Sequence, residues 1–434
     1  MRQNDTVVVD HIGLHAKICN FRDKFAHIWN QLPTTFPVFN KTYSPVEQAI
    51  HEQKLYNALE HAQSESFEFN SITDIDPGKI DAIKSKIRLS IHEFLQSSPL
   101  CRNDGFIDKC CDSGFDFIKM AKRFDPLLTG EEIYQALRNV WIINSVQLYL
   151  GKPIIVTLSA FAYSMLYPYT DDYLDDPAVT PAEKMKFIAT VRCMLSGVDV
   201  KVFNSNLKKI RNLITMIEQE YPREHYPQVY ESLLEIHRAQ GRSLQEHQGN
   251  YHVAETDILD ISIDKGGTSV VADACLVSGY LDDDVLEFMF GLGVVLQFID
   301  DYQDVEQDIE HGHNTIFTTA RESGNLEHAT NKLLHFTEWL SCGGRIFPLD
   351  EGVALSDLSL LSCRILIFEA LSHRRDRLSE SYVNALEPYS PLRFDCLSNL
   401  RQQIEQNMTE RKSNNDSIMP TSDILKFEHM VMGL

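Results

Sequence analysis

The chain has no excess of positive charge. Its 434 residues include 40 lysines and arginines against 62 aspartates and glutamates, a net charge of −22. A protein with this balance repels polyanions as a whole, so neither nucleic acid nor an anionic membrane surface is an expected partner.

Cysteine pairs with metal-binding or redox spacing are also missing. The nine cysteines are odd in number and scattered, and no two of them form a CxxC pair. This usage predicts reduced thiols and a cytoplasmic location. The longest apolar stretch, residues 151–167, contains too many polar groups to cross a bilayer, so we expect no transmembrane segment.

Alternating strand patterns are scarce, and nucleotide-binding glycine motifs are missing. Apolar residues recur at intervals of three and four along most of the chain, which predicts an all-α fold. Thr180, followed by Pro181 and Glu183, predicts a helix start. The Gly-Gly of IDKGG, residues 263–267, predicts a break between helices. No P-loop or GxGxxG after a strand is found, which argues against nucleotide and nicotinamide chemistry.

No low-complexity linker divides the chain. We expect an N-terminal helical region over residues 1–100 that packs on the core, and a single helical domain over residues 101–410 that carries the chemistry. The polar tail, residues 411–434, is expected to be loose, with a short docking helix at its end as one option.

Two acidic clusters stand out against this background, and each one ends an apolar run. The first contains Asp171, Asp172, Asp175 and Asp176, and the second contains Asp300, Asp301, Asp304 and Asp308. In a helix, positions three and four apart share a face, so each cluster forms a row of carboxylates that repel one another. A bound cation relieves that repulsion, and hard oxygen ligands favour Mg²⁺, which in turn favours a phosphate substrate. The alternative is a pair of solvated acidic faces without chemistry.

The spacing within the clusters resembles that of a known family. Gly293, Gln297, Asp300, Asp301 and Asp304 reproduce the GxxxQxxDDxxD motif of trans-prenyl diphosphate synthases, and the segment 171–175 reproduces their first DDxxD. The resemblance covers roughly Gln135 to Phe317 and extends in outline to the large terpene synthases of bacteria. It implies the class I isoprenoid synthase fold, a helical bundle around a deep central pocket. It also implies three Mg²⁺ ions at the pocket mouth, for which Mn²⁺ can substitute.

The resemblance assigns roles to particular residues. The metal ligands would be Asp171, Asp172, Asp175, Asp300, Asp304 and Asp308, with Asp301 as a further catalytic member of the second motif. The diphosphate would be bound by Lys265, Gln297 and Arg242, with Arg374 and Arg375 as weaker candidates. Tyr163, Tyr167 and Phe298 would line the pocket, although core packing is an alternative role for these rings. The segment HGHNTIF, residues 311–317, would form a lid.

One departure from the family pattern bears on the reaction. The arginine pair that follows the first motif in chain-elongating synthases is missing, and Tyr167 and Tyr163 lie four and eight positions before Asp171, where they would obstruct a growing chain. We therefore expect a cyclase that ionises one linear prenyl diphosphate of farnesyl length or longer. Two alternatives stay open: a coupling enzyme, by elongation or by head-to-head joining as in squalene and phytoene synthases, and a divalent-ion-binding scaffold without catalysis. A homodimer is compatible with the resemblance.

Overall fold

A computed structural model describes residues 13–63, 66–68, 106–176, 178–247, 255–343, 352–400 and 418–420, together with positions 85 and 402. Within these ranges the backbone of the first acidic motif is described, but the side chains of Asp171, Asp172 and Asp175 are not.

The described chain is all-α apart from one short antiparallel ladder, in which β1 (Ser66–Glu68) pairs with β2 (Ile418–Pro420). The helices before the first acidic motif are α1 (Leu14–Gln31), α2 (Pro45–Gln63), α4 (Phe106–Phe124), α5 (Gly130–Tyr149) and α6 (Leu158–Ser164). The motif-bearing helices and those between them are α7 (Leu166–Asp175), α8 (Pro181–Leu195), α9 (Ser205–Glu220), α10 (Pro227–His247), α11 (Glu255–Ser278), α12 (Asp283–Gln303) and α13 (Val305–His311). The remaining elements are α14 (Ile316–Glu322), α15 (Leu326–Gly343), α16 (Gly352–His373), η4 (Arg375–Arg377), α17 (Glu380–Leu386) and η5 (Glu387–Tyr389).

The helix starts follow from side-chain caps that satisfy the unpaired amides of the first turn. Thr180 precedes α8 and accepts a hydrogen bond from the Glu183 amide, while the Glu183 carboxylate accepts one from the Thr180 amide. This reciprocal capping box, with Pro181 in the first turn, confirms the helix start predicted from the sequence. Thr129 and Glu132 start α5 in the same way.

The predicted break at the Gly-Gly pair is wrong, because α11 runs unbroken through Gly266 and Gly267. These glycines instead bring α11 against α12. A Cβ atom on Gly266 would lie 2.4 Å from the carbonyl oxygen of Gly293, and one on Gly293 would lie 2.1 Å from the carbonyl oxygen of Gly266. No side chain fits at such distances, so the two backbones touch where the helices cross. The glycine of the second motif is therefore a packing residue.

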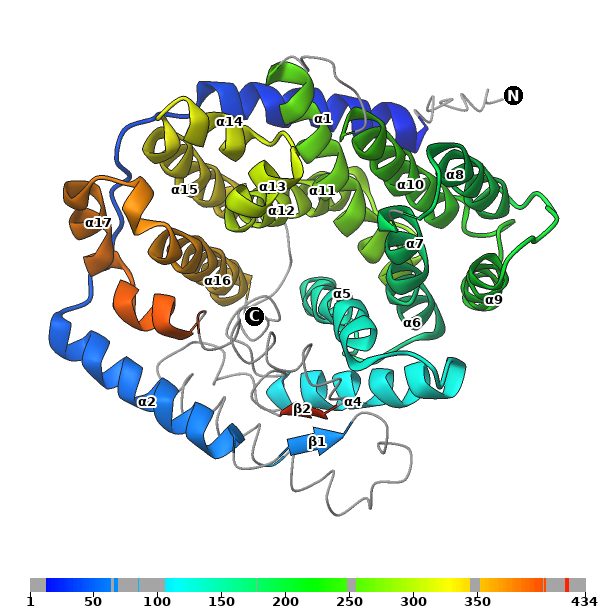
Figure 1. Cartoon of the computed structure of the whole chain (residues 1–434), viewed down its shortest axis with the longest axis horizontal. Coiled ribbons are helices and arrows are strands. Elements are labelled where there is room, and N and C mark those ends of the chain that lie inside the picture. The colour runs from blue at the N-terminus through cyan, green and yellow to red at the C-terminus, as the bar shows by residue number, and fades with distance from the viewer. Residues whose placement is uncertain are drawn as a thin grey trace, which may run out of the picture.

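Figure 1 shows how the helices surround the middle of the molecule. α12 contacts α11, α15 and α16, and α5 contacts α4, α6, α7 and α11. α1 lies across the outer side of the bundle, where it contacts α10, α11, α12 and α15 (Figure 1). The two helices that carry the acidic motifs, α7 and α12, thus belong to one framework in which α5 adjoins the first.

The N-terminal helices are attached to distant parts of the chain. Phe25 of α1 is buried against Phe290 and Phe336, and Gln48 of α2 donates hydrogen bonds to the backbone carbonyls of Glu387 and Ser390. The segment that could form a docking helix after residue 420 lies outside the described residues. In the described part of the chain, no helix combines the length and the apolar character that crossing a bilayer requires.

Candidate functional site

The second acidic motif lies where two helices meet end to end. α12 ends at Gln303, Asp304 caps it, and α13 begins at the next residue. The amide of Asp304 donates to the carbonyl of Asp300, and the amide of Asp308 donates to the carbonyl of Asp304. The helical hydrogen bonding that links these three aspartates at four-residue intervals therefore continues through the junction.

The two adjacent aspartates of this motif have opposite surroundings. Asp301 is 7% exposed and accepts hydrogen bonds of 2.7 Å from the Ser262 hydroxyl of α11 and from the Gln297 amide. Burial raises the pKa of Asp301 to about 7, with Asp300 adding to the shift, whereas Lys265 and the two hydrogen bonds oppose it. The side chain of Asp300 is 45% exposed. Asp301 thus anchors α12 to α11, and Asp300 is the member that can meet a ligand.

Lys265 of α11 acts electrostatically on two carboxyl groups of the second motif. Its charge acts on Asp301 and on Asp308, in each case against the effect of burial, which raises the pKa of both carboxyl groups. His313 Nδ1 lies 3.4 Å from a carboxylate oxygen of Asp308. Lys265 lies in the middle of α11, and its contact with a diphosphate stays a prediction.

Arg138 is a neighbour of the motif that sequence reasoning missed. Its Nη2 lies 3.8 Å from Oδ1 of Asp300, and its side chain is 43% exposed. The next residue, Asn139, is buried and donates hydrogen bonds of 3.1 Å to Asp273 of α11 and to Ser164 of α6, which fixes the orientation of α5. An arginine within an amphipathic helix gives no sequence signal of its own, because only the tertiary packing of α5 decides what it faces.

The first motif is helical, as predicted, through Asp175. Asp176 lies beyond the helix, is exposed and accepts a hydrogen bond of 2.8 Å from the amide of Ala178, so its predicted place on a helical row is wrong. Among the side chains that the structure describes, no three His, Cys, Asp or Glu residues gather as a metal-binding group. The carboxylates of Asp171, Asp172 and Asp175 are outside that set, so the convergence of the two rows stays a prediction.

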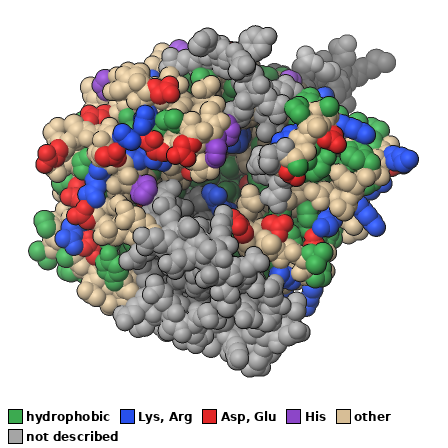
Figure 2. Space-filling model, in the orientation of Figure 1, with side chains coloured by type: hydrophobic (Ala, Val, Ile, Leu, Met, Phe, Trp, Pro, Cys, Tyr) green, Lys and Arg blue, Asp and Glu red, His purple; other side chains and the backbone are tan. Residues whose placement is uncertain are grey.

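Helix α5 connects the two motifs through its contacts. It packs against α7, which carries the first motif, and its Arg138 reaches Asp300 of the second. Figure 2 shows a hollow near the middle of the face seen in Figure 1, with basic and acidic side chains at its edge.

A small pocket lies on the side of α7 that precedes the first motif. Tyr163, Tyr167 and Thr170 line it together with residues of α8 and α10, among them Leu233 and His237. Its volume of about 40 Å³ is far below the roughly 300 Å³ or more that is typical of ligand pockets. The rings of Tyr163 and Tyr167 meet edge to face, with centroids 6.0 Å apart. Both tyrosines line this small pocket. Their place in the deep pocket implied by the resemblance stays a prediction.

Phe298 is placed in the aromatic core. It is fully buried, and its ring contacts Trp29, Phe317 and Phe336. It is not among the residues that line the pocket beside Tyr163.

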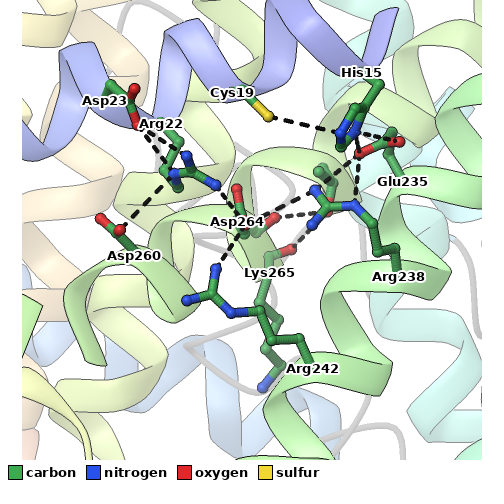
Figure 3. Close-up of polar contacts among 11 residues, drawn as sticks. His15, Cys19, Arg22, Asp23, Glu235, Arg238, Arg242, Asp260, Asp264 and Lys265 are labelled. Atoms are coloured by element: carbon green, nitrogen blue, oxygen red, sulfur yellow. Dashed lines mark hydrogen bonds and ion pairs between the residues drawn. The ribbon is translucent and has the colours of Figure 1, made fainter. Parts of the chain in front are cut away.

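Arg242 takes part in a charged cluster around a buried carboxylate. Asp264 of α11 is 1% exposed, and its Oδ2 lies 3.4 Å from Arg242 Nη1, 3.6 Å from Arg22 Nη1 and 3.8 Å from Arg238 Nη2. Figure 3 shows these guanidiniums converging on Asp264 from α1 and α10, beside Lys265. Burial raises the pKa of Asp264, and the three arginines oppose that shift. In this arrangement Arg242 helps to tie α10 and α1 to α11.

The other two arginine candidates also have partners in the protein. Arg374 is 7% exposed and donates hydrogen bonds to the backbone carbonyls of Tyr302 and Gln303, at the C-terminus of α12. It therefore neutralises the helix end that carries the acidic row. Arg375 Nη1 donates to Asp395 at 2.6 Å.

The segment expected to form a lid is a short connection. It spans the end of α13, a turn at Gly312 in the left-handed conformation, and the start of α14. Thr315 caps α14 and is 8% exposed, and Phe317 is fully buried. Its closing movement stays a prediction.

A scan against protein-family models and searches of the curated proteins and of the solved structures return no match to this chain. The family resemblance therefore depends on the motifs and on the geometry given above.

Proposed function

We propose that this chain is a Mg²⁺-dependent class I terpene synthase, a cyclase that ionises one linear prenyl diphosphate of farnesyl length or longer and releases pyrophosphate. The observation that carries the proposal is the position of α5. It packs against the helix of the first motif, and its Arg138 lies 3.8 Å from Asp300 of the second. Two motifs that are remote in sequence thereby adjoin one helix.

The donor set fits Mg²⁺. The ion typically binds through one or two protein carboxylates together with phosphate oxygens, without a closed protein cage. Asp300 is half exposed, and Asp304 and Asp308 follow it at four-residue intervals. Backbone hydrogen bonds join Asp304 to Asp300 and Asp308 to Asp304. Asp300, Asp304 and Asp308 would hold the ion on this wall, and Asp171, Asp172 and Asp175 would hold it on the other.

Different residues of the chain would contribute to ionisation in different ways. The allylic C–O bond breaks and its electron pair stays on the diphosphate oxygen, so negative charge develops on the leaving group. The bound ion supplies Lewis-acid stabilisation of that charge. Lys265 adds a fixed positive charge beside it. Asp301, held by Ser262 and Gln297, keeps α12 in register with α11.

The tyrosines of α6 and α7 would stabilise the carbocation. Aromatic faces attract a cation by roughly 0.5 to 2 kcal/mol each. Tyr167 lies one helical turn before Asp171, so its ring would belong to the wall below the metal site. A chain of farnesyl length does not fit a cavity of about 40 Å³. The proposal therefore requires the chain to lie in the hollow of Figure 2, with the tyrosines at its side, or the pocket to widen on binding.

The decisive test supplies farnesyl, geranylgeranyl and longer diphosphates with Mg²⁺, each alone and each with isopentenyl diphosphate, followed by analysis of hydrocarbon products and pyrophosphate. A cyclic or rearranged hydrocarbon from a single diphosphate is the expected result. Pyrophosphate release only with two substrates would support a coupling enzyme instead. Metal binding without any turnover would support the scaffold.

Asp300→Asn should lower turnover by at least about 100-fold, because a ligand to the ion is lost while the helix is kept. Asp284→Asn is the matched control, since Asp284 is exposed in the first turn of the same helix. Turnover of Asp300→Asn near that of the control would contradict the metal assignment.

A further inference from the structure

The described arginines near the second motif differ in what they bind. Arg242 contacts the buried carboxylate of Asp264, which Arg22 and Arg238 also surround (Figure 3). Arg374 is buried against backbone carbonyls of α12, and Arg375 is hydrogen-bonded to Asp395. Arg138 is different, because the carboxylate it meets belongs to the motif itself.

The contact between Arg138 and Asp300 is suited to exchange. Nitrogen and oxygen are 3.8 Å apart, beyond hydrogen-bond length, and both side chains are more than 40% exposed. An ion pair between solvated groups contributes only about 0 to 1 kcal/mol, so the contact with Asp300 itself opposes exchange only weakly. A guanidinium also matches the oxygens of a phosphate in two-point geometry.

The backbone under Arg138 is firmly held, in contrast to its side chain. Asn139 is buried and its amide bridges Asp273 and Ser164, and Asn144 one turn further on accepts a hydrogen bond of 2.9 Å from Ser113. These buried contacts set the rotation of α5. Arg138 is therefore presented to α12 by a rigid element, as a ligand-binding group requires.

We propose that Arg138 is a pyrophosphate-binding residue that exchanges partners: it faces Asp300 in the ligand-free protein and turns to a diphosphate oxygen when Asp300 binds a cation. This rests on the proposed function and deepens it, because it names a pyrophosphate-binding residue on α5, beside the second motif. Exchange makes cation and pyrophosphate binding mutually dependent, since each ligand removes a competitor of the other.

The test measures binding and needs no turnover. Inorganic pyrophosphate is titrated by calorimetry into the full chain at fixed Mg²⁺, and Mn²⁺ is titrated alone. Arg138→Gln should weaken pyrophosphate binding by roughly 10- to 100-fold, as expected for the loss of a charge-assisted contact. The same variant should bind Mn²⁺ alone as well as the wild type or better, because Asp300 loses a competing cation. Asp300→Asn should weaken Mn²⁺ binding, so of the two variants only Asp300→Asn lowers the metal affinity.

Two further variants separate binding from folding. Arg138→Lys keeps the positive charge but loses the two-point geometry of the guanidinium. It should retain part of the pyrophosphate affinity that Arg138→Gln loses. Arg192→Gln removes an exposed guanidinium from the last turn of α8 and should leave pyrophosphate binding unchanged. Pyrophosphate affinity of Arg138→Gln within about twofold of the wild type would overturn the exchange while leaving the proposed function intact. Failure of the wild type to bind pyrophosphate or to turn over any prenyl diphosphate would overturn both.

Discussion

The role of a side chain in this protein depends more on its surroundings than on its residue type. Asp300 and Asp301 are adjacent, yet one is half exposed beside Arg138 and the other is buried under hydrogen bonds from Ser262 and Gln297. The helical periodicity explains this difference, since neighbouring positions point about 100° apart. Gln297 was expected to bind diphosphate, but its side-chain amide donates a hydrogen bond to Asp301. The second aspartate and the glutamine of the motif thus support the first aspartate.

A buried carboxyl group outside the motifs should make the stability of the protein depend on pH. Asp273 of α11 is fully buried; its Oδ1 accepts from Asn139, and no hydrogen-bond partner is described for its Oδ2. Burial raises the pKa of Asp273 well above its ordinary value. The folded protein therefore holds a proton that the unfolded chain releases above about pH 4, and this contribution to stability falls as the pH rises toward the folded pKa.

Asp273→Asn should remove that loss, because the amide stays neutral and its oxygen can still accept from Asn139. Relative to the wild type, the variant should gain stability as the pH rises from about 4.5 to about 8, because its amide has no proton to lose. Urea unfolding at the two pH values measures it. The same substitution at Asp116, whose side chain is 64% exposed, is the control and should give no such gain. An equal stability difference at both pH values would mean that Asp273 is ionised in the folded protein.

At the scale of elements, the sequence predicted what local chemistry determines. The all-α fold, the start of α8 at Thr180 and the helical first motif were predicted correctly, because capping and apolar periodicity act within a few residues. The break at Gly266 and Gly267 was predicted wrongly. A glycine pair has the same local signature in a turn and at a close helix crossing, and only the partner helix distinguishes the two. Arg138 was missed for the same reason.

The close crossing of α11 and α12 should make the protein sensitive to any side chain at Gly266. Gly266→Ala places a methyl group 2.4 Å from the Gly293 carbonyl oxygen and from Cβ of Gln297, and neither helix can yield without moving the acidic motif. Overpacking against backbone should lower the free energy of unfolding by about 3 kcal/mol or more. Gly114→Ala in α4 is the control, because its nearest neighbours would be at 3.8 Å and alanine favours the helix by about 1 kcal/mol. Thermal and urea unfolding of both variants measure the difference, and two variants of equal stability would show that the helices can separate without cost.

The N-terminal helix α1 joins several helices of the described chain. α1 packs its aromatic side on α12 and α15 through Phe25 and Trp29, and its polar side contributes Arg22 to the cluster around Asp264. That cluster adjoins Lys265, so the N-terminal helix reaches the residues next to the candidate site (Figure 3). No family motif marks α1 in the sequence, because its role lies in packing and any apolar face of the right shape would serve.

If α1 belongs to the same cooperative unit as α11 and α12, its backbone amides should exchange with solvent only through global unfolding. Phe25→Ala removes a ring that is 1% exposed and contacts Phe290, Phe336 and Trp339, and should cost about 3 to 5 kcal/mol. Hydrogen exchange followed by mass spectrometry should then show protection falling by the same free energy in α1, α11 and α12. Val38→Ala, at a position that is 83% exposed, should leave protection unchanged within about 0.5 kcal/mol. Loss of protection in α1 alone would mean that this helix opens independently, and the candidate site would then not depend on it.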